Sequence, residues 1–161
     1  MKYLFIAVSS LLAIVAQTIA GSNFFLFNFL DLSLLLITYW AMYRNRTQAL
    51  FTGALTGLLL DAMLGWPLGY NGFGKTLAAF AIGQAVRKAN TDEKWIRFLI
   101  IVSASCLNSL SIFLLFWLTQ RPTNNIYLSS SVIQALITAG VGILVFAAMD
   151  SYRQAQTRKV G

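Results

Sequence analysis

Six long apolar segments, separated by short polar stretches, make up most of the chain. A helix that crosses the ~30 Å hydrocarbon core of a bilayer takes about 20 residues at a rise of ~1.5 Å per residue, and four of the segments are close to that length, whereas the third and fourth are shorter. The pattern predicts six transmembrane helices, at residues 3–20, 24–43, 49–64, 72–86, 98–118 and 129–149. A basic tail, 150–161, follows the last of them. The predicted fold class is therefore an all-α polytopic membrane protein.

No stretch between these segments is both long and polar enough to form a soluble domain. Hydrophobic residues make up 58% of the 161 positions and charged residues 11%, and the mean hydropathy is +0.69. These values lie far outside the usual range for a soluble protein. We therefore expect residues 1–161 to form a single membrane domain.

The first apolar segment also resembles a secretory signal peptide. Thr18, Ile19 and Ala20 precede Gly21 in a small-residue pattern that is typical of a cleavage site. Cleavage would leave five helices with the same loops inside, so the charge pattern does not decide between the two interpretations. We expect the segment to be retained as a membrane helix.

Lysine and arginine lie mainly on one side of the predicted helices. Ten of the twelve fall in segments on that side, and only Lys75 and Arg121 fall on the other. Because positively charged loops stay in the cytoplasm, we expect both termini to be cytoplasmic. The net charge of +7 then reflects membrane topology and contact with anionic lipids, and we expect no nucleic-acid partner.

The chain is poor in residues that perform catalysis or bind metals. It has no histidine, and Cys106 is its single cysteine, which rules out an internal disulfide and a paired-thiol metal site. We therefore expect no catalytic residues, no metal and no cofactor, and a membrane enzyme is the least favoured class.

Small residues recur every four positions between residues 49 and 65, so that on a helix they form one stripe. In membranes such stripes let two helix backbones approach closely. The stripe and the turn that follows it predict a set of positions for helix packing or partner binding: Gly53, Gly57, Asp61, Gly65, Pro67 and Gly69. The sequence leaves open whether the stripe meets a helix of this chain or of a partner.

Three charged residues, Asp31, Asp61 and Lys75, lie within the predicted helices. An ionised side chain at the centre of a membrane helix costs about 2.5–3.5 kcal/mol even on the lenient insertion scale, so each should face protein or water. Asp61 and Lys75 flank the same short turn, and we expect them to form an ion pair. Asp31 is an intramembrane acidic residue without a partner nearby in the sequence. We favour a structural role for both aspartates over a proton or cation path.

The last two apolar segments carry polar stripes. The fifth contains Ser103, Ser105, Cys106, Asn108, Ser109 and Ser111, and the sixth contains Ser131, Gln134 and Thr138. Polar residues between membrane helices commonly form interhelical hydrogen bonds. Helix packing is therefore the favoured interpretation, and a solute pocket is the alternative.

One extended motif resembles a known family. It runs Gly53-x-x-x-Gly57-x-x-x-Asp61-x-x-x-Gly65-x-Pro67-Leu68-Gly69, and it is preceded by Asp31-Leu32 and the run LLLITYW at 34–40. This pattern is similar to that of the rod shape-determining protein MreD family, whose length and number of helices also agree. The family often has proline before the aspartate of the second helix, where this chain has Leu30.

The resemblance implies a non-enzymatic scaffold subunit of the bacterial cell-elongation machinery, located in the cytoplasmic (inner) membrane. Such a subunit would bind the membrane-anchored, single-span protein MreC and help to link MreB filaments to peptidoglycan synthesis. RodA and a class B transpeptidase would lie nearby. The resemblance also implies a fold similar to the substrate-binding subunits of energy-coupling-factor transporters. The alternative function is a small-solute binding or transport subunit with a pocket near Asp31 and Asp61.

Overall fold

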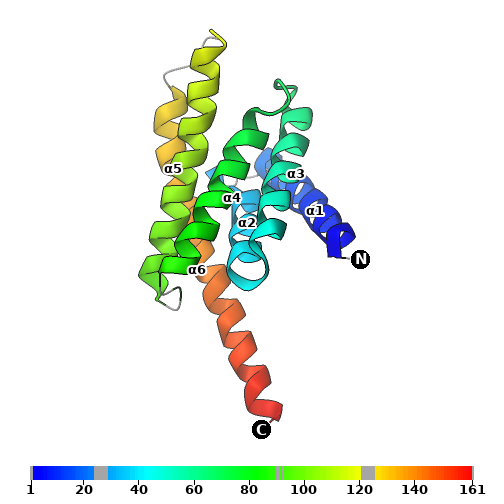
Figure 1. Cartoon of the computed structure of the whole chain (residues 1–161), viewed down its shortest axis with the longest axis vertical. Coiled ribbons are helices and arrows are strands. Elements are labelled where there is room, and N and C mark those ends of the chain that lie inside the picture. Colours follow the sequence, from blue (N-terminus) through cyan, green and yellow to red (C-terminus); the bar gives the residue numbers. More distant parts are fainter. Residues whose placement is uncertain (1, 24–28, 90, 92, 121–125, 161) are drawn as a thin grey trace.

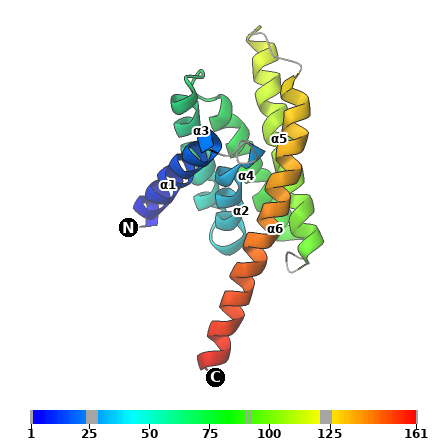
Figure 2. The same ribbon diagram turned by 180° about the vertical axis from the view of Figure 1, so that it is seen from behind.

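The computed structural model of the chain is a bundle of α-helices (Figures 1 and 2). It describes residues 2–23, 29–89, 91, 93–120 and 126–160. Arg121 and residues 24–28, which the sequence assigns to an outer loop and to the start of the second apolar segment, lie outside this part. The described residues contain six helices and no strand, which confirms the predicted all-α fold class.

The helices are α1 (Lys2–Asn23), α2 (Leu32–Tyr43), α3 (Arg46–Leu64), α4 (Tyr70–Lys88), α5 (Lys94–Leu118) and α6 (Ile126–Val160). In the described part, three helical stretches are long and apolar enough to cross a membrane: Arg46–Leu64, Lys94–Leu118 and Ser131–Tyr152. Leu4–Ile19 and Leu32–Tyr43 are apolar but shorter. The number of helices agrees with the sequence pattern, whereas a membrane crossing by all six stays a prediction.

α2 is shorter than the predicted second span and lies in the middle of the bundle (Figure 1). It contacts all five other helices, and Leu34 and Ile37 on it are fully buried. Its 12 residues span only ~18 Å at the helical rise. The helix begins directly after Asp31, whose carboxylate accepts a hydrogen bond from the backbone N–H of Leu34 at 3.0 Å. Asp31 is thus an N-cap, the position at which aspartate stabilises a helix start.

α3 and α4 form an antiparallel hairpin, and the residues between them have the backbone conformations that their glycines allow. Gly65 ends α3 with φ 65°, and Gly69 precedes α4 with φ 105°. Residues with a side chain rarely adopt such positive φ values. An added Cβ at either position would meet nothing within 4 Å, so backbone conformation, and not space, accounts for both glycines.

The small-residue stripe of α3 packs against α4 of the same chain. A Cβ on Gly57 would lie 2.5 Å from the backbone of Asn71 and Gly72, and a Cβ on Gly53 would lie 2.7 Å from the carbonyl oxygen of Lys75. Side chains at these positions would push the two helices apart. The face that carries Gly53 and Gly57 is therefore occupied within the chain, and it offers no surface to a partner.

α6 continues from the predicted end of the last span, Met149, to Val160, so that the basic tail is largely helical. Its 35 residues span ~52 Å at the helical rise, well above the ~30 Å of a hydrocarbon core. Its C-terminal part extends beyond the rest of the bundle (Figures 1 and 2).

Asp150 ties α6 to its neighbours at the point where α6 leaves the bundle. The Tyr43 hydroxyl, at the end of α2, donates to Asp150 Oδ1 at 2.9 Å. Arg97 Nη1, near the start of α5, contacts Asp150 Oδ2 at 2.5 Å, and Arg97 Nε donates to the carbonyl oxygen of Thr91. One carboxylate therefore joins three helices at this end of the bundle.

Candidate functional site

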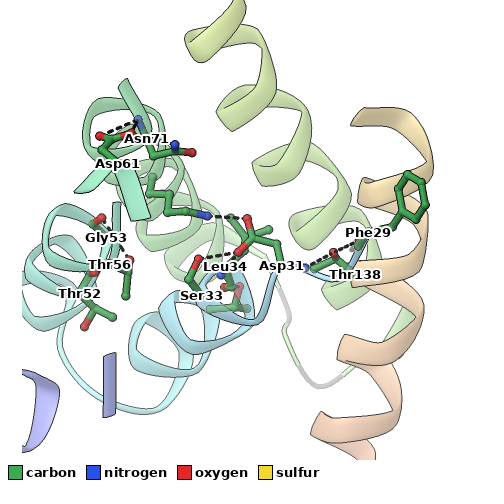
Figure 3. Close-up of polar contacts among 12 residues, drawn as sticks. Phe29, Asp31, Ser33, Leu34, Thr52, Gly53, Thr56, Asp61, Asn71 and Thr138 are labelled. Atoms are coloured by element: carbon green, nitrogen blue, oxygen red, sulfur yellow. Dashed lines mark hydrogen bonds and ion pairs between the residues drawn. The ribbon is translucent and has the colours of Figure 1, made fainter. Parts of the chain in front are cut away.

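A buried ion pair lies in the interior of the bundle. Lys75 Nζ contacts Asp31 Oδ2 at 2.5 Å, and the two side chains are 1% and 5% exposed. The other carboxylate oxygen of Asp31 accepts from the Ser33 hydroxyl at 2.5 Å. The backbone N–H of Asp31 donates to the Thr138 hydroxyl at 3.0 Å (Figure 3). Through these contacts Asp31 connects α2 with α4 and α6.

The predicted ion pair between Asp61 and Lys75 was wrong. The prediction placed the two residues at similar depth on either side of one turn. Depth does not fix the direction of a side chain, because each residue turns by 100° around the helix axis. The Lys75 side chain points toward the start of α2, where Asp31 is its partner. The sequence indicated no partner for Asp31, and in the structure this partner is Lys75.

Asp61 instead binds the first residues of α4 (Figure 3). Its carboxylate accepts from the backbone N–H groups of Gly69 at 2.9 Å, Asn71 at 3.0 Å and Gly72 at 3.3 Å, and from Asn71 Nδ2 at 2.9 Å. The first N–H groups of a helix have no partner inside the helix, and a negative charge there interacts favourably with the helix dipole. Gly69 has no side chain to cap α4. Asp61, which is fully buried, provides this cap from the neighbouring helix.

A cavity of about 420 Å³ borders the ion pair. Asp31 and Lys75 form part of its wall, together with polar residues from α1, α4, α5 and α6: Gln17, Thr18, Asn71, Asn108, Ser109 and Gln134. The remainder is apolar and includes Leu60, Leu64, Trp66 and Ile112. A pocket therefore exists near Asp31, as the alternative function requires, but Asp61 does not line it.

Residues 1–152 match the family model of the rod shape-determining protein MreD. The chain belongs to the MreD family. The match confirms the resemblance that the motif in residues 30–74 indicated, and it makes the chain a membrane protein with a role in rod shape determination. No curated protein and no solved structure matches the chain. The similarity to energy-coupling-factor subunits thus stays a prediction.

In this member of the MreD family, the motif residues build the α3–α4 hairpin. Gly53 and Gly57 permit the close approach, Asp61 caps α4, and Gly65 and Gly69 adopt positive φ. The carbonyl oxygen of Pro67 accepts from the backbone N–H of Tyr70. Leu30 stands where the family often has proline, and α2 begins directly after Asp31.

Sequence reasoning missed two parts of the polar network. Asn71 donates to Asp61, which caps α4. Because polar residues cluster at helix starts, its position two residues after Gly69 could have indicated this role. The sequence places Asp150 in the tail and shows Arg97 only as one of the ten basic residues on the cytoplasmic side. No pattern along the chain links these two residues, which meet only once α5 and α6 are packed.

Proposed function

We propose that the chain is a non-enzymatic membrane scaffold of the bacterial cell-elongation machinery. In this role it binds MreC and thereby links MreB filaments to peptidoglycan synthesis, with RodA and a class B transpeptidase nearby. The observation that carries the proposal is the match of residues 1–152 to the MreD family.

The state of the charged interior supports a structural over a catalytic role. Asp31 holds Lys75 and the start of α2, and Asp61 holds the start of α4. Each of these groups is engaged in contacts that stabilise the fold, so that neither carboxylate is a free acid or base. A scaffold needs a body that keeps its outer faces in place, and this network joins α2, α3, α4 and α6.

The outward faces of the helices are the surfaces on which a single-span partner would dock, since α4 covers the Gly53 and Gly57 face. Large apolar side chains are exposed along α1, including Leu4, Phe5, Val8, Leu11, Leu12 and Val15. Exposed apolar residues also occur on α5 and α6, among them Leu110 and Leu144. Apolar outer faces suit contact with lipid tails or with a partner helix.

The positions of the basic residues support insertion in the inner membrane with both termini in the cytoplasm. Arg46 begins α3, Arg87 and Lys88 end α4, and Lys94 begins α5. Successive helices run in opposite directions, so these helix ends lie at the same end of the bundle. The positive-inside rule assigns that end to the cytoplasm. Trp95 beside them is 77% exposed, as suits a residue at the lipid headgroups. Anionic lipids are the expected contact of this end.

Photo-crosslinking in native membranes tests the proposal. A photoreactive residue is placed at the exposed positions Leu12, Leu110 and Leu144 in turn, and at the fully buried Ile37 as the matched control. We expect MreC among the crosslinked products from at least one outward position and none from position 37. Recovery of MreC from no outward position would contradict direct binding.

A further inference from the structure

Among the described residues that line the cavity beside the ion pair, the charges balance. They include one carboxylate, Asp31, and one ammonium group, Lys75, and the two already contact each other at 2.5 Å. A charged solute would have to break this pair to gain a counter-charge, and an unpaired buried charge is strongly unfavourable. The wall therefore favours a molecule without net charge.

Several polar groups of the wall have hydrogen-bonding capacity that the described residues do not use. An ammonium group has three N–H donors, and among the described residues that of Lys75 donates to Asp31 alone. Asn108 is 7% exposed, and its Oδ1 accepts no hydrogen bond from any described residue. The same holds for Gln17 Oε1. A buried polar group without a partner destabilises the fold, so a ligand that supplies the partner gains free energy.

Asn108 is held in place by the close approach of α4. A Cβ on Gly74 would lie 2.7 Å from Asn108 Oδ1 and 3.1 Å from its backbone carbonyl oxygen. This glycine leaves just enough room for the amide. Oδ1 itself is buried against Gly74. Since Asn108 lines the cavity and its Nδ2 donates to no described residue, the acceptor for this N–H group can come from a molecule in the cavity.

We propose that this cavity binds a neutral, polyhydroxylated molecule of the sugar type. A hydroxyl group donates and accepts at the same atom, which suits a wall that contains an ammonium group, a hydroxyl group and the side-chain amides of Gln17, Asn108 and Gln134. The apolar wall, with Trp66 and Ile112, offers contact to the C–H face of a ring. The volume of about 420 Å³ lies within the range of small-molecule sites. This site is independent of the scaffold role, and its ligand is either free in solution or the headgroup of a glycolipid.

A thiol placed in the cavity wall tests the proposal. The variant carries Cys106→Ser, which removes the single, exposed cysteine, and Ser109→Cys. The protein is purified in a detergent without a sugar headgroup, and the rate of reaction with a small methanethiosulfonate reagent is measured. The probes are glucose, its anionic and cationic relatives gluconate and glucosamine, and monoglucosyl diacylglycerol in mixed micelles.

Glucose or the glucolipid is expected to slow the reaction by a factor of 1 + [L]/Kd, about fivefold at four times Kd. Gluconate and glucosamine at equal concentration are expected to leave the rate unchanged. Adding Asn108→Leu should abolish the protection, whereas Leu110→Ala on the outward face of α5 should retain it. Protection by the glucolipid alone would identify a lipid headgroup, and protection by both would show that the free sugar suffices.

Thermal unfolding gives a second readout that does not depend on the thiol. Ligand binding to the folded state raises the unfolding midpoint, so the neutral probe that protects should raise it in the unmodified chain and not in Asn108→Leu. An absence of both protection and thermal shift with both neutral probes would overturn the proposal. Equal effects of the charged and neutral probes would overturn it as well.

Discussion

At the scale of single residues, the account depends on the pair of Asp31 and Lys75. Removal of one member of a buried ion pair leaves an uncompensated charge, which typically costs about 3–5 kcal/mol, whereas replacement of both by neutral groups is often nearly neutral. Asparagine at position 31 would keep the cap of α2, because it is as good an N-cap as aspartate.

Asp31→Asn and Lys75→Met should therefore each lower the free energy of unfolding by about 3–5 kcal/mol. The double variant should recover most of this loss. Denaturant unfolding in mixed micelles, followed by helical circular dichroism, measures the three values. Single variants as stable as the parent chain would show that the two side chains do not depend on each other.

Asp61 has a different role, and its substitution should have a different result. Asp61→Ala removes the acceptor of the N–H groups of Gly69, Asn71 and Gly72, and we expect a loss of about 2 kcal/mol or more. Asp61→Asn keeps one amide oxygen and should lose less. Lys75→Met combined with Asp61→Ala should show additive losses, because the two residues do not form a pair. Strong coupling between them in a double-mutant cycle would restore the pairing that the sequence suggested.

At the scale of elements, the α3–α4 hairpin shows what the sequence could and could not predict. The four-residue spacing from Gly53 to Gly65 predicted a close-packing face on a helix, and the structure shows the close approach at Gly53 and Gly57 but not at Gly65. The spacing says nothing about what meets this face, since backbone atoms of Asn71 and Lys75 fill it only after the chain turns back. This packing also fixes the rotation of α4 about its axis. The rotation directs the Lys75 side chain toward Asp31 and away from Asp61.

Gly57→Ala should destabilise the hairpin by several kcal/mol, because the new Cβ would lie 2.5 Å from backbone atoms of α4 that have no flexible side chain to move aside. Gly140→Ala is the matched control on α6, where a Cβ would meet nothing within 4 Å, and it should be neutral or slightly stabilising. Unfolding measurements on both variants check the difference. Equal stability of the two would contradict close packing at Gly57.

The extent of α2 and α6 was harder to predict from hydropathy. Hydropathy alone places residues 24–43 in one segment and does not show where α2 begins. Asp31 is the N-cap of α2 and not a polar residue within a longer helix. The polar composition of the tail likewise hides its helicity, since no apolar period marks a helix that leaves the bundle.

Loss of the Asp150 contacts, which join α2, α5 and α6, should change stability only near that end of the bundle. Tyr43→Phe removes the hydroxyl that donates to Asp150, at a cost of about 1 kcal/mol. Hydrogen exchange followed by mass spectrometry should show faster exchange in the last turns of α6 within the bundle, with α3 and α4 unchanged. Uniformly faster exchange along the chain would indicate that the contact supports the whole fold.

At the scale of the whole molecule, family membership and the six-helix architecture agree with a body that is rigid inside and apolar outside. Three carboxylates join helices at separate places: Asp31 and Asp61 in the interior, through the ion pair and the cap of α4, and Asp150 at the end of the bundle where α6 leaves it. If the protein is a scaffold, these charges act by keeping its helices in place, and they take part in no chemical step of rod shape determination.

The double variant Asp31→Asn with Lys75→Met tests this claim most directly, because it removes both charges while it keeps the cap of α2. It is expressed in cells that lack the native protein, and cell width and length are measured together with the recovery of MreC in native-membrane crosslinking. The account predicts a stable protein, bound MreC and rod-shaped cells. A stable protein that binds MreC but leaves the cells round would contradict it, and would assign the ion pair an active role.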